Sequence, residues 1–362
     1  MRMTASSVLA ESEMLLDQPL PSVRGFEPRD EAAWEAFVFA QGDTTFFHRA
    51  GWRRVIENGL GHRAYYRCAW RSKTLVGILP LIEVKSRLFG HALVSLAFGV
   101  AGGIAAVDAA AVAALAEDAA QLGAQLGVDF IELRHETARD IPWITKPDVY
   151  ATFRRALSRD DAANLKAIPR KKRADLRKAI DNKSLTTEID VDPKIFHRIY
   201  SESLRNLGTP VQSLRFYAAI AAEFGDAVEI STISSPGGPV AALMTYFFKD
   251  IAMPFYGGAT PAARPLHAYD LLYWRLMGRA VERGCSMFDF GRSKRGTGAF
   301  DYKTYWGFEP TPLAYQFHLV HMNDVPEINP LNPKYRLMID SWKRLPLPVA
   351  NTLGPPIARQ IA

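Results

Sequence analysis

A short segment near residue 300 gathers side chains suited to binding an anionic or carbonyl-bearing ligand. Within twelve residues the chain places four cations against one acid, Asp301; the cations are Arg292, Lys294, Arg295 and Lys303. Tyr302 and Tyr305 lie beside the lysine and offer flat surfaces and hydroxyl donors, and nearby glycines let a backbone approach a ligand closely. Loops that follow a strand are where α/β proteins place ligands. The segment is therefore either a binding site or a solvated basic loop over aromatic core residues.

Two further features could contribute to a site. Asp289 lies in the strand expected before this loop, where its carboxylate can orient a ligand or satisfy neighbouring backbone amides, and Tyr256 is a candidate substrate-binding residue. Residues 166–183 hold eight Lys or Arg against two Asp, whereas the rest of the chain is balanced, with 36 basic and 36 acidic residues. This run predicts a helix that is either a solvated charged face or a polyanion-binding surface formed by Arg170, Lys171, Arg173 and Arg177.

Several motifs of known chemistry are absent from the sequence. There is no GxSxG, no GxxxxGK[ST], no HExxH and no metal-like spacing of His and Cys. We therefore expect no nucleophile elbow, no P-loop, no metal site and no tightly bound cofactor. Cys68 and Cys285 form no CxxC motif and are expected to be structural thiols of a cytoplasmic protein.

The elements that must position these residues occur twice, in the same order. Each half shows three strands, a glycine-rich turn, a helix and a final strand, with the closing segments LGVDFIELR and RGCSMFDFGR 157 residues apart. The repeat predicts a duplicated mixed α/β (α+β) unit. The first copy has strands at 63–71, 73–84, 93–98 and 129–134, and a helix at 107–126; the second has strands at 227–234, 239–248, 251–256 and 287–292, and a helix at 267–284.

The remaining segments suggest how the chain is divided. We expect a loose tail at 1–20, a first lobe at 21–153, a second lobe at 154–323 and a Pro-rich tail at 324–362 with a short helix near 333–344. The second lobe would include a basic helical insertion at 160–225, with helices at 161–183, 193–208 and 213–225, and a last strand at 311–320.

Neither a signal peptide nor a membrane span is expected. Acidic residues interrupt the apolar stretch that a signal peptide would need near the N-terminus. The run 92–116 has one charge, but glycines divide it into two short pieces, which a buried strand, a turn and a buried helix explain.

Three segments resemble the FemAB family of aminoacyl transferases, whose fold consists of tandem GNAT-like units. They are TTFFHRAGWRRVI (44–56), LKAIPRKKRADLRKAI (165–180) and FDFGRSKRGTGAFDYKTYWGFEPTPLAYQF (288–317). The details of the third segment are similar to FemAB-like proteins associated with exosortase, PEP-CTERM and exopolysaccharide loci. The acetyl-CoA signature of ordinary GNAT enzymes, [QR]xxGx[GA], is not matched, because Ser293 stands where Arg or Gln should be.

The resemblance implies an acyltransferase that moves an aminoacyl group from aminoacyl-tRNA to an amine of a cell-envelope or exopolysaccharide precursor. In this interpretation Lys303, Tyr302 and Asp289 are catalytic residues. The substrate-binding residues would be His48, Trp52, Tyr256, Arg292, Lys294, Arg295 and Tyr305. For His48 and Trp52 the other interpretation is a capped, half-buried helix.

Two alternative functions stay open at this level. One is an N-acyltransferase that uses acyl-CoA or an acyl carrier protein in exopolysaccharide biosynthesis, and the other is a non-catalytic polysaccharide-assembly protein. The expected partners are an acyl donor, with tRNA as one candidate, and a nucleotide- or lipid-linked sugar precursor, but not DNA. The expected location is the cytoplasm, with peripheral association at the inner face of the membrane as an option.

Overall fold

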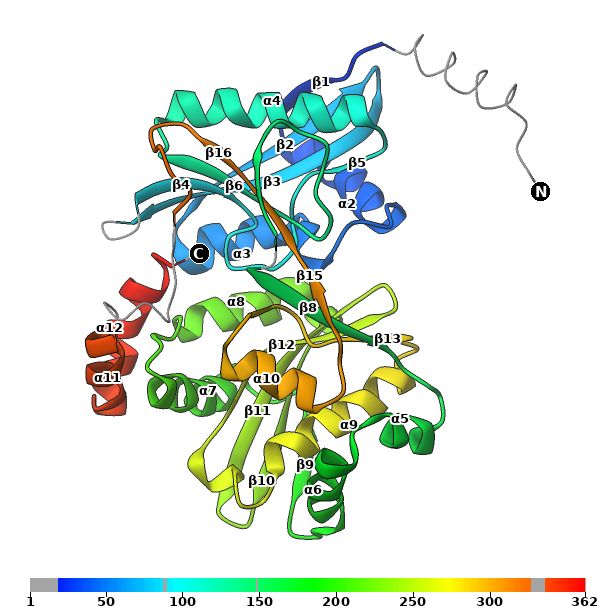
Figure 1. The fold of residues 1–362 in the computed structure, drawn as a ribbon, viewed down its shortest axis with the longest axis vertical. Helices are drawn as coiled ribbons and strands as arrows, with labels where there is room; N and C mark the ends of the chain where they lie inside the picture. The colour runs from blue at the N-terminus through cyan, green and yellow to red at the C-terminus, as the bar shows by residue number, and fades with distance from the viewer. Residues whose placement is uncertain (1–18, 87–89, 148, 327–335, 362) are drawn as a thin grey trace, which may run out of the picture.

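The computed structural model describes residues 19–86, 90–147, 149–326 and 336–361. Within these residues the chain forms two mixed sheets of eight strands each, which lie one above the other in Figure 1. The first sheet has the order β1-β2-β3-β4-β6-β16-β7, with β5 paired to β3. The second has the order β14-β8-β13-β12-β11-β10-β9, with β15 paired to β8.

The first sheet is built mainly from the first half of the chain. Its helices are α2 (Glu31–Ala40), α3 (Gly51–Leu60) and α4 (Ala109–Leu126). Its strands are β1 (Ser22–Gly25), β2 (Arg63–Arg71), β3 (Thr74–Ser86), β4 (Gly90–Ser95), β5 (Ala105–Ala106), β6 (Phe130–His135), β7 (Ile144–Lys146) and β16 (Ala314–Leu319).

The second sheet draws on the middle and later parts of the chain. Its strands are β8 (Tyr150–Ala156), β9 (Thr186–Ile189), β10 (Val228–Ser235), β11 (Gly238–Phe248), β12 (Ile251–Ala259), β13 (Met287–Asp289), β14 (Ser293–Lys294) and β15 (Pro310–Pro312). Its helices are α5 (Asp161–Ala167), α6 (Arg170–Asp181), α7 (Pro193–Leu207), α8 (Leu214–Phe224), α9 (Ala268–Glu282) and α10 (Gly298–Tyr305).

The two sheets repeat one pairing scheme, which confirms the predicted duplication. In the first, β2, β3 and β4 pair antiparallel, β4 pairs parallel with β6, and β6 pairs antiparallel with β16. In the second, β10, β11 and β12 pair antiparallel, β12 pairs parallel with β13, and β13 pairs antiparallel with β8. In each unit the helix between the two parallel strands, α4 or α9, crosses over the sheet. The predicted α/β fold of two tandem GNAT-like units is therefore correct.

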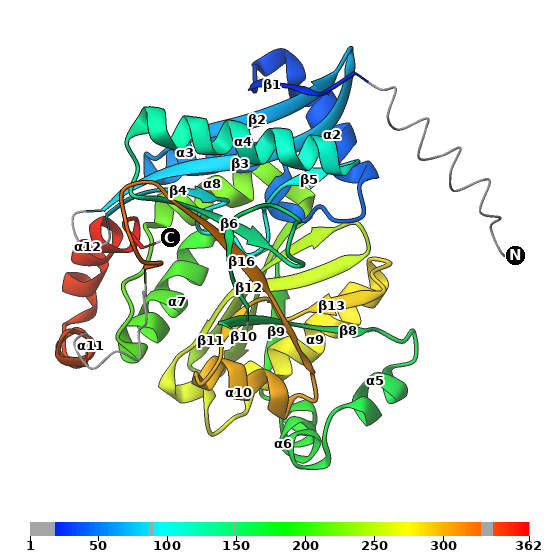
Figure 2. The same ribbon diagram turned by 45° about the horizontal axis from the view of Figure 1, so that its top comes forward.

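The two units exchange their last strands. β8 directly follows the first unit along the chain but pairs in the second sheet, and β16 follows the second unit but pairs in the first sheet. The two strands pass each other between the halves of the molecule (Figures 1 and 2). The sheets therefore do not follow the expected lobes, because 150–153 lies in the second sheet and 314–319 lies in the first. The division at residues 153 and 154 stays a prediction.

Two strands end earlier than the sequence predicts, for a backbone reason. The strand expected at 93–98 stops at Ser95, because Leu96 and Phe98 have φ values of 51° and 67°. The strand expected at 287–292 stops at Asp289, and Gly291 then turns the chain with a φ of 70°. Positive φ breaks the extended conformation that a ladder requires, and glycine adopts it without steric cost.

In the helical insertion α7 and α8 pack on the second sheet, and the C-terminal segment packs on α7 and reaches the first unit. α5 and α6 are separated at Pro169, as expected, and α7 and α8 end at Gly208 and Gly225. The segment expected as a Pro-rich tail contains α11 (Arg336–Lys343) and also α12 (Leu347–Ala358), which was not expected. Both helices pack on α7, and the carbonyl of Arg359 meets His62 of the first unit at 2.7 Å. Residues 1–18 of the expected N-terminal tail lie outside the described residues.

Three apolar clusters hold this arrangement together. The largest is continuous between the units and includes Trp34, Trp52, Phe216 and Tyr246. A second fills the space between α9, α10 and the second sheet, and a third lies under α4. The run 92–116 forms most of β4, a turn, the short strand β5 and the first part of α4. None of the helices in the described residues is long and apolar enough to span a bilayer.

Candidate functional site

The parallel strands of the second unit separate after two paired residues, and we call the region between their diverging ends the wedge. β12 and β13 pair only at Ile251 with Met287 and at Ala252 with Phe288. Beyond these pairs β12 continues to Ala259, while the chain after β13 turns away at Gly291. Tyr256 and Arg292 therefore lie beyond the last paired residues, on the two sides of the wedge. Parallel strands that separate at their carboxyl ends form a common place for a ligand.

Arg292 connects this wedge to both exchanged strands. Its Nη1 donates a hydrogen bond to the Tyr315 hydroxyl at 2.9 Å, and its guanidinium carbon lies 4.5 Å from the centre of the Tyr150 ring. Tyr315 in turn donates to the carbonyl of Val100 at 3.1 Å. Burial lowers the pKa of Arg292, but the tyrosines and Glu132 outweigh this effect and raise it above its ordinary value. The side chain is therefore a fixed cation at the junction of the two units.

Lys303 lies on a helix and not in the loop that the sequence predicts. The side chain of Thr297 caps α10 by accepting from the amide of Phe300, which is a favourable N-terminus for this sequence. One turn later, Lys303 Nζ donates to the carbonyls of Gly291 at 2.9 Å and Arg292 at 3.0 Å. Burial lowers its pKa to about 7; Asp289 opposes this effect and Arg292 adds to it.

Asp289 is buried and fully hydrogen-bonded by protein groups. It accepts from Thr152 Oγ1 at 3.0 Å, from the Gly291 amide at 2.7 Å and from Arg154 Nε at 2.6 Å. Arg154 also forms a two-pronged ion pair with Glu136. Burial lowers the pKa of Arg154, but Glu136 and Asp289 raise it above its ordinary value. The carboxylate therefore fixes the turn whose carbonyls hold Lys303.

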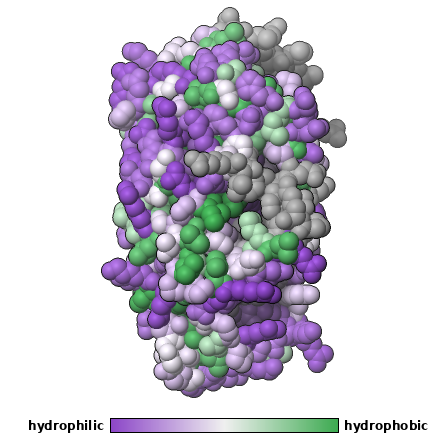
Figure 3. Space-filling model, turned by 90° about the vertical axis from the view of Figure 1, so that its left-hand side faces the viewer, coloured by the Kyte–Doolittle hydropathy of each residue, from purple (hydrophilic) through white to green (hydrophobic). Residues whose placement is uncertain are grey.

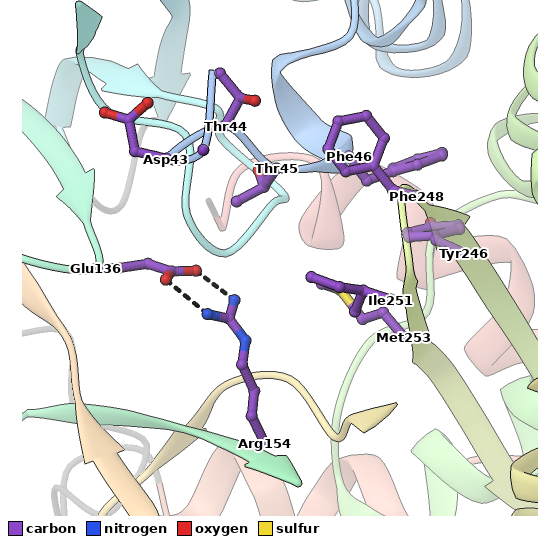
Figure 4. A pocket seen from close by; sticks show the side chains of 11 residues that line it. Asp43, Thr44, Thr45, Phe46, Glu136, Arg154, Tyr246, Phe248, Ile251 and Met253 are labelled. Atoms are coloured by element: carbon purple, nitrogen blue, oxygen red, sulfur yellow. Dashed lines mark hydrogen bonds and ion pairs between the residues drawn. The ribbon is translucent and has the colours of Figure 1, made fainter. Parts of the chain in front are cut away.

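A small pocket between the units lies beside the Arg154–Glu136 pair (Figure 4). The first unit supplies Glu136 and the loop from Gly42 to Phe46, and the second supplies Arg154 and an apolar wall. Figure 4 shows the guanidinium and the carboxylate facing each other along one side of this space. The wall consists of Tyr246, Phe248, Ile251 and Met253. The ion pairs of Arg154 with Glu136 and with Asp289 thus link the pocket to the turn whose carbonyls bind Lys303.

Tyr302 points away from Lys303, toward the start of α9. Its hydroxyl donates to Asp270 at 2.7 Å, and Lys172 Nζ lies 2.5 Å from the same carboxylate oxygen. Burial, with the charge of Asp270, raises the pKa of Tyr302 well above its ordinary value. Tyr305 is 68% exposed. Lys294 lies 5.9 Å from the centre of the Tyr150 ring and Arg295 lies 5.6 Å from that of Phe300.

Of the other predicted binding residues, two lie away from the wedge and one, Tyr256, lies beside it. His48 is buried, accepts from the Thr45 amide at 3.0 Å and contacts the Gly103 carbonyl at 3.0 Å; burial lowers its pKa to about 4. Trp52 is completely buried against Phe47. Neither is brought to the wedge. Tyr256 packs on Tyr200 and Tyr217, and burial raises its pKa well above the ordinary value.

The basic helix α6 lies against α9 and turns most of its cations outward. Leu176 and Ala179 are buried, and Lys172 points inward to Asp270. Arg170, Lys171 and Arg177 are exposed and Arg173 is half-buried. The helix therefore presents a cationic surface next to the start of α9.

Comparisons with known proteins agree with this geometry. Residues 150–304 match the family model described as an acetyltransferase (GNAT) domain. The structure of FemX is similar with a TM-score of 0.63 and 12% identity, covering 88% of this chain and 100% of that one. A tandem GNAT protein from the clavulanic acid biosynthesis pathway gives a TM-score of 0.54 and 11% identity, covering 84% of this chain and 100% of that one.

The chain therefore has the predicted tandem GNAT-like fold, similar to that of FemX. A third solved structure, the C-terminal domain of a putative lysylphosphatidylglycerol synthetase from Agrobacterium fabrum, has a TM-score of 0.53 and 13% identity, covering 80% of this chain and 92% of that one. None of the curated proteins matches the sequence. The domain match supports the predicted enzyme class, a GNAT-type acyltransferase, which requires an acyl donor.

The corresponding helices of both units carry a carboxylate, paired with a cation, at the N-cap or in the first turn. Asp108 caps α4 by accepting from the Ala111 amide at 2.9 Å, and lies 2.8 Å from Arg71. In the second unit Asp270, in the first turn of α9, is paired with Lys172. The positive end of a helix dipole attracts anions such as phosphates. The Asp108 carboxylate occupies this position at α4, whereas the Asp270 carboxylate lies in the first turn of α9 and binds Tyr302 and Lys172.

Sequence reasoning missed several residues of the site. Arg154, Glu136 and Tyr150 lie in or near strands, and their partners are more than a dozen residues away in the chain. The one available signal was the pair Arg154 and Arg155 inside an otherwise buried strand, since a buried charge needs a partner. Within the described residues no group of three or more His, Cys, Asp or Glu side chains is arranged to hold a metal ion.

Proposed function

We propose that this protein transfers an aminoacyl group from aminoacyl-tRNA to an amine of a cell-envelope or exopolysaccharide precursor. The observation that carries the proposal is the carboxylate–cation pair at the start of α9, repeated at the start of α4. A CoA pyrophosphate placed at either helix N-terminus would have to compete with the carboxylate–cation pair there. A donor that does not place a pyrophosphate there avoids this competition, and an aminoacyl ester of tRNA is such a donor.

The similar structures and the basic helix support the same donor. FemX and the lysylphosphatidylglycerol synthetase domain share this fold, and the second name denotes an aminoacylated lipid as product. The exposed cations of α6, Arg170, Lys171 and Arg177, lie beside α9, where they can contact the phosphates of an RNA acceptor stem. An ester of tRNA is already activated, so the reaction needs no ATP site.

Lys303 is the residue proposed to polarise the ester. Its ammonium has three N–H donors, and the carbonyls of Gly291 and Arg292 take two of them. The third can be donated to the carbonyl oxygen of the acyl donor, whose negative charge grows in the transition state. The acceptor amine attacks the ester carbon, a C–N bond forms, the C–O bond to the ribose breaks, and the amine proton passes to the leaving ribose oxygen.

The acceptor is proposed to bind in the wedge through Arg292 and Lys294. The guanidinium is held by Tyr315 and Tyr150 and so presents a fixed charge to a phosphate or carboxylate of a nucleotide- or lipid-linked sugar precursor. Tyr256 of β12 faces the guanidinium of Arg292. Holding ester and amine together supplies much of the rate enhancement by proximity alone.

One observation favours a second candidate function. The family model matched by residues 150–304 describes an acetyltransferase, so an N-acyltransferase that uses acyl-CoA or an acyl carrier protein is the alternative. The two candidates share the acceptor and differ only in the donor.

The test is a comparison of donors under single-turnover conditions. The enzyme is mixed with a pool of tRNA charged with radiolabelled amino acids, with radiolabelled acetyl-CoA, or with acylated carrier protein, each with a cell extract of nucleotide- and lipid-linked sugar precursors. Label from tRNA in an amide-linked, base-stable product supports the proposal. Label from acetyl-CoA or the carrier protein alone contradicts it, and no label from any donor indicates a non-catalytic assembly protein.

A further inference from the structure

The two C-terminal helices present an apolar surface to solvent instead of burying it. In α12 the buried positions are small, Ala350, Gly354 and Ala358, and follow one another at intervals of four. A Cβ atom on Gly354 would lie 3.1–3.2 Å from the backbone of Val211, so this face packs closely on the body of the protein. The large residues Val349 and Leu353, also four apart, are exposed. Residues four apart share one side of a helix, so they form an outward apolar stripe.

The neighbouring helices extend this stripe. Leu337 and Met338 of α11 are 81% and 50% exposed, whereas Trp342 of the same helix is buried. Leu207, at the end of α7, is 65% exposed and lies next to Gly208, which contacts Ile339 of α11. Figure 3 shows apolar side chains gathered over these helices on one face of the molecule. We define the C-terminal apolar face as Leu207, Leu337, Met338, Val349 and Leu353.

Exposed cations lie at both ends of α11, the helix that carries Leu337 and Met338 of the C-terminal apolar face. Residues 336–361 contain four basic residues and one acid, Asp340. Arg336, Lys343 and Arg344 are exposed, and Lys343 also lies 3.7 Å from Asp340. Arg205 holds the end of α11 by donating to the carbonyls of Lys343 and Leu345 at 3.4 Å. Apolar side chains framed by Lys and Arg are the arrangement that binds the interface of an anionic bilayer.

We propose that the C-terminal apolar face docks this protein onto an anionic lipid bilayer. The apolar side chains would enter the boundary between headgroups and acyl chains, and Arg336, Lys343 and Arg344 would contact lipid phosphates. α11 and α12 also bridge the units, since the carbonyl of Arg359, just after α12, meets His62 of the first unit and α11 packs on α7 of the second. Docking through them would hold both units against the membrane.

Vesicle co-sedimentation of the full-length protein tests this proposal without donor or acceptor, so its outcome is independent of the proposed transfer reaction. We expect binding to vesicles of phosphatidylcholine with phosphatidylglycerol, and weaker binding to phosphatidylcholine alone. Leu353→Glu combined with Leu337→Glu should weaken binding by about tenfold or more, since each leucine buried in the interface contributes favourable transfer free energy. Replacing Arg336, Lys343 and Arg344 by Gln should weaken it several-fold and reduce its dependence on salt.

The matched control is Val107→Glu, at a side chain that is 48% exposed and precedes α4, a helix that lies away from α11 and α12 in Figure 1. It introduces the same kind of side chain and should bind vesicles like the wild type. Equal binding by the wild type and the Leu337→Glu, Leu353→Glu variant, with both folded by circular dichroism, would overturn the proposal. So would absence of binding to anionic vesicles, or a dimer in sedimentation velocity that this variant abolishes, because the face would then be covered by a second copy.

Discussion

Arg292 donates a hydrogen bond to the hydroxyl of Tyr315 across 2.9 Å and thereby joins the two sheets where their strands are exchanged. Arg292 follows β13 of the second sheet, and Tyr315 belongs to β16 of the first. Because Tyr150 of β8 lies under the same guanidinium, one cation contacts both exchanged strands. The wedge of the second unit is thus built partly from the first half of the chain.

The pair of Arg154 and Asp289 should contribute strongly to the stability of the fold. Asp289 is 1% exposed, so Arg154→Met would leave a buried carboxylate without its cation. We expect the free energy of unfolding to fall by about 3–5 kcal/mol, as when one partner of a buried ion pair is removed. Urea denaturation measures this change.

Two further variants show whether the pair itself is responsible. Adding Asp289→Asn to Arg154→Met should restore part of the lost stability, and Arg159→Met, at an exposed arginine in the loop after β8, should change it little. Additive effects of Arg154→Met and Asp289→Asn would show that the two side chains do not interact.

Two buried histidines should make the protein sensitive to acid. Burial lowers the pKa of His48 to about 4 and that of His135 to about 3. In the unfolded chain both titrate near the ordinary value of about 6.5, so between pH 6.5 and 4 the unfolded state binds more protons than the folded one. Stability should therefore fall as pH falls through this window.

Thermal denaturation as a function of pH tests the role of these imidazoles. His48→Gln, which keeps a polar side chain, should flatten the loss of melting temperature below pH 6.5, whereas His321→Gln, at an exposed position, should not. The same acid dependence in His48→Gln as in the wild type would assign the effect to other groups.

The sequence predicts the elements well because their signals are local. Apolar periodicity and glycines at 127, 208 and 225 mark the ends of α4, α7 and α8 to within a few residues. The exchange of β8 and β16 has no such signal. Both are short strands with similar burial. Which sheet each strand joins depends on long-range contacts such as that of Arg292 with Tyr315, and these two residues lie far from β8 in the chain.

The site was predicted in the same uneven way. A cation-rich segment after a strand indicated the neighbourhood of Arg292 and Lys303. The sequence could not show that Lys303 faces the Gly291 carbonyl while Tyr302, one residue earlier, faces Asp270, because neighbouring helix positions point about 100° apart. Nor could it show that His48 is turned inward, since the Gly103 carbonyl that it contacts is 55 residues away.

The cations of α6 should determine how strongly binding of charged tRNA depends on salt. Replacing Arg170, Lys171, Arg173 and Arg177 by Gln should lower affinity and reduce the log–log salt slope by roughly 0.7–0.9 for each phosphate that is no longer neutralised. Fluorescence anisotropy with labelled tRNA over a range of salt measures both quantities. Lys178→Gln, which removes a cation already paired with Asp175, is the control and should change the slope little. An unchanged slope in the fourfold variant would mean that α6 is a solvated face.

Removing Lys303 should lower turnover while the fold persists. Lys303→Met removes the donor proposed to polarise the ester, and the loss of one such donor typically costs on the order of 10²–10³ in rate. Lys303→Arg should restore only part of it, because a planar guanidinium places its charge differently. Lys73→Met, at an exposed turn between β2 and β3, is the matched control and should retain wild-type turnover. Full activity in Lys303→Met would remove this assignment.

The lowered pKa of Lys303 gives a pH signature that separates two roles. With a pKa of about 7, the side chain is a cation below pH 7 and a neutral amine above it. If it polarises the ester as a cation, the ratio of wild-type turnover to Lys303→Arg turnover should fall as pH rises through 7, and taking the ratio cancels the titration of the acceptor amine. A ratio that rises instead would identify Lys303 as a general base.

Stability provides an independent check, because the unfolded lysine keeps its proton up to about pH 10.4. Between pH 7 and that value the unfolded state binds more protons than the folded state, so the free energy of unfolding should rise with pH in the wild type and not in Lys303→Met. The same pH dependence of stability in both proteins would show that the lysine is not desolvated, and the acid–base argument for its role would fail.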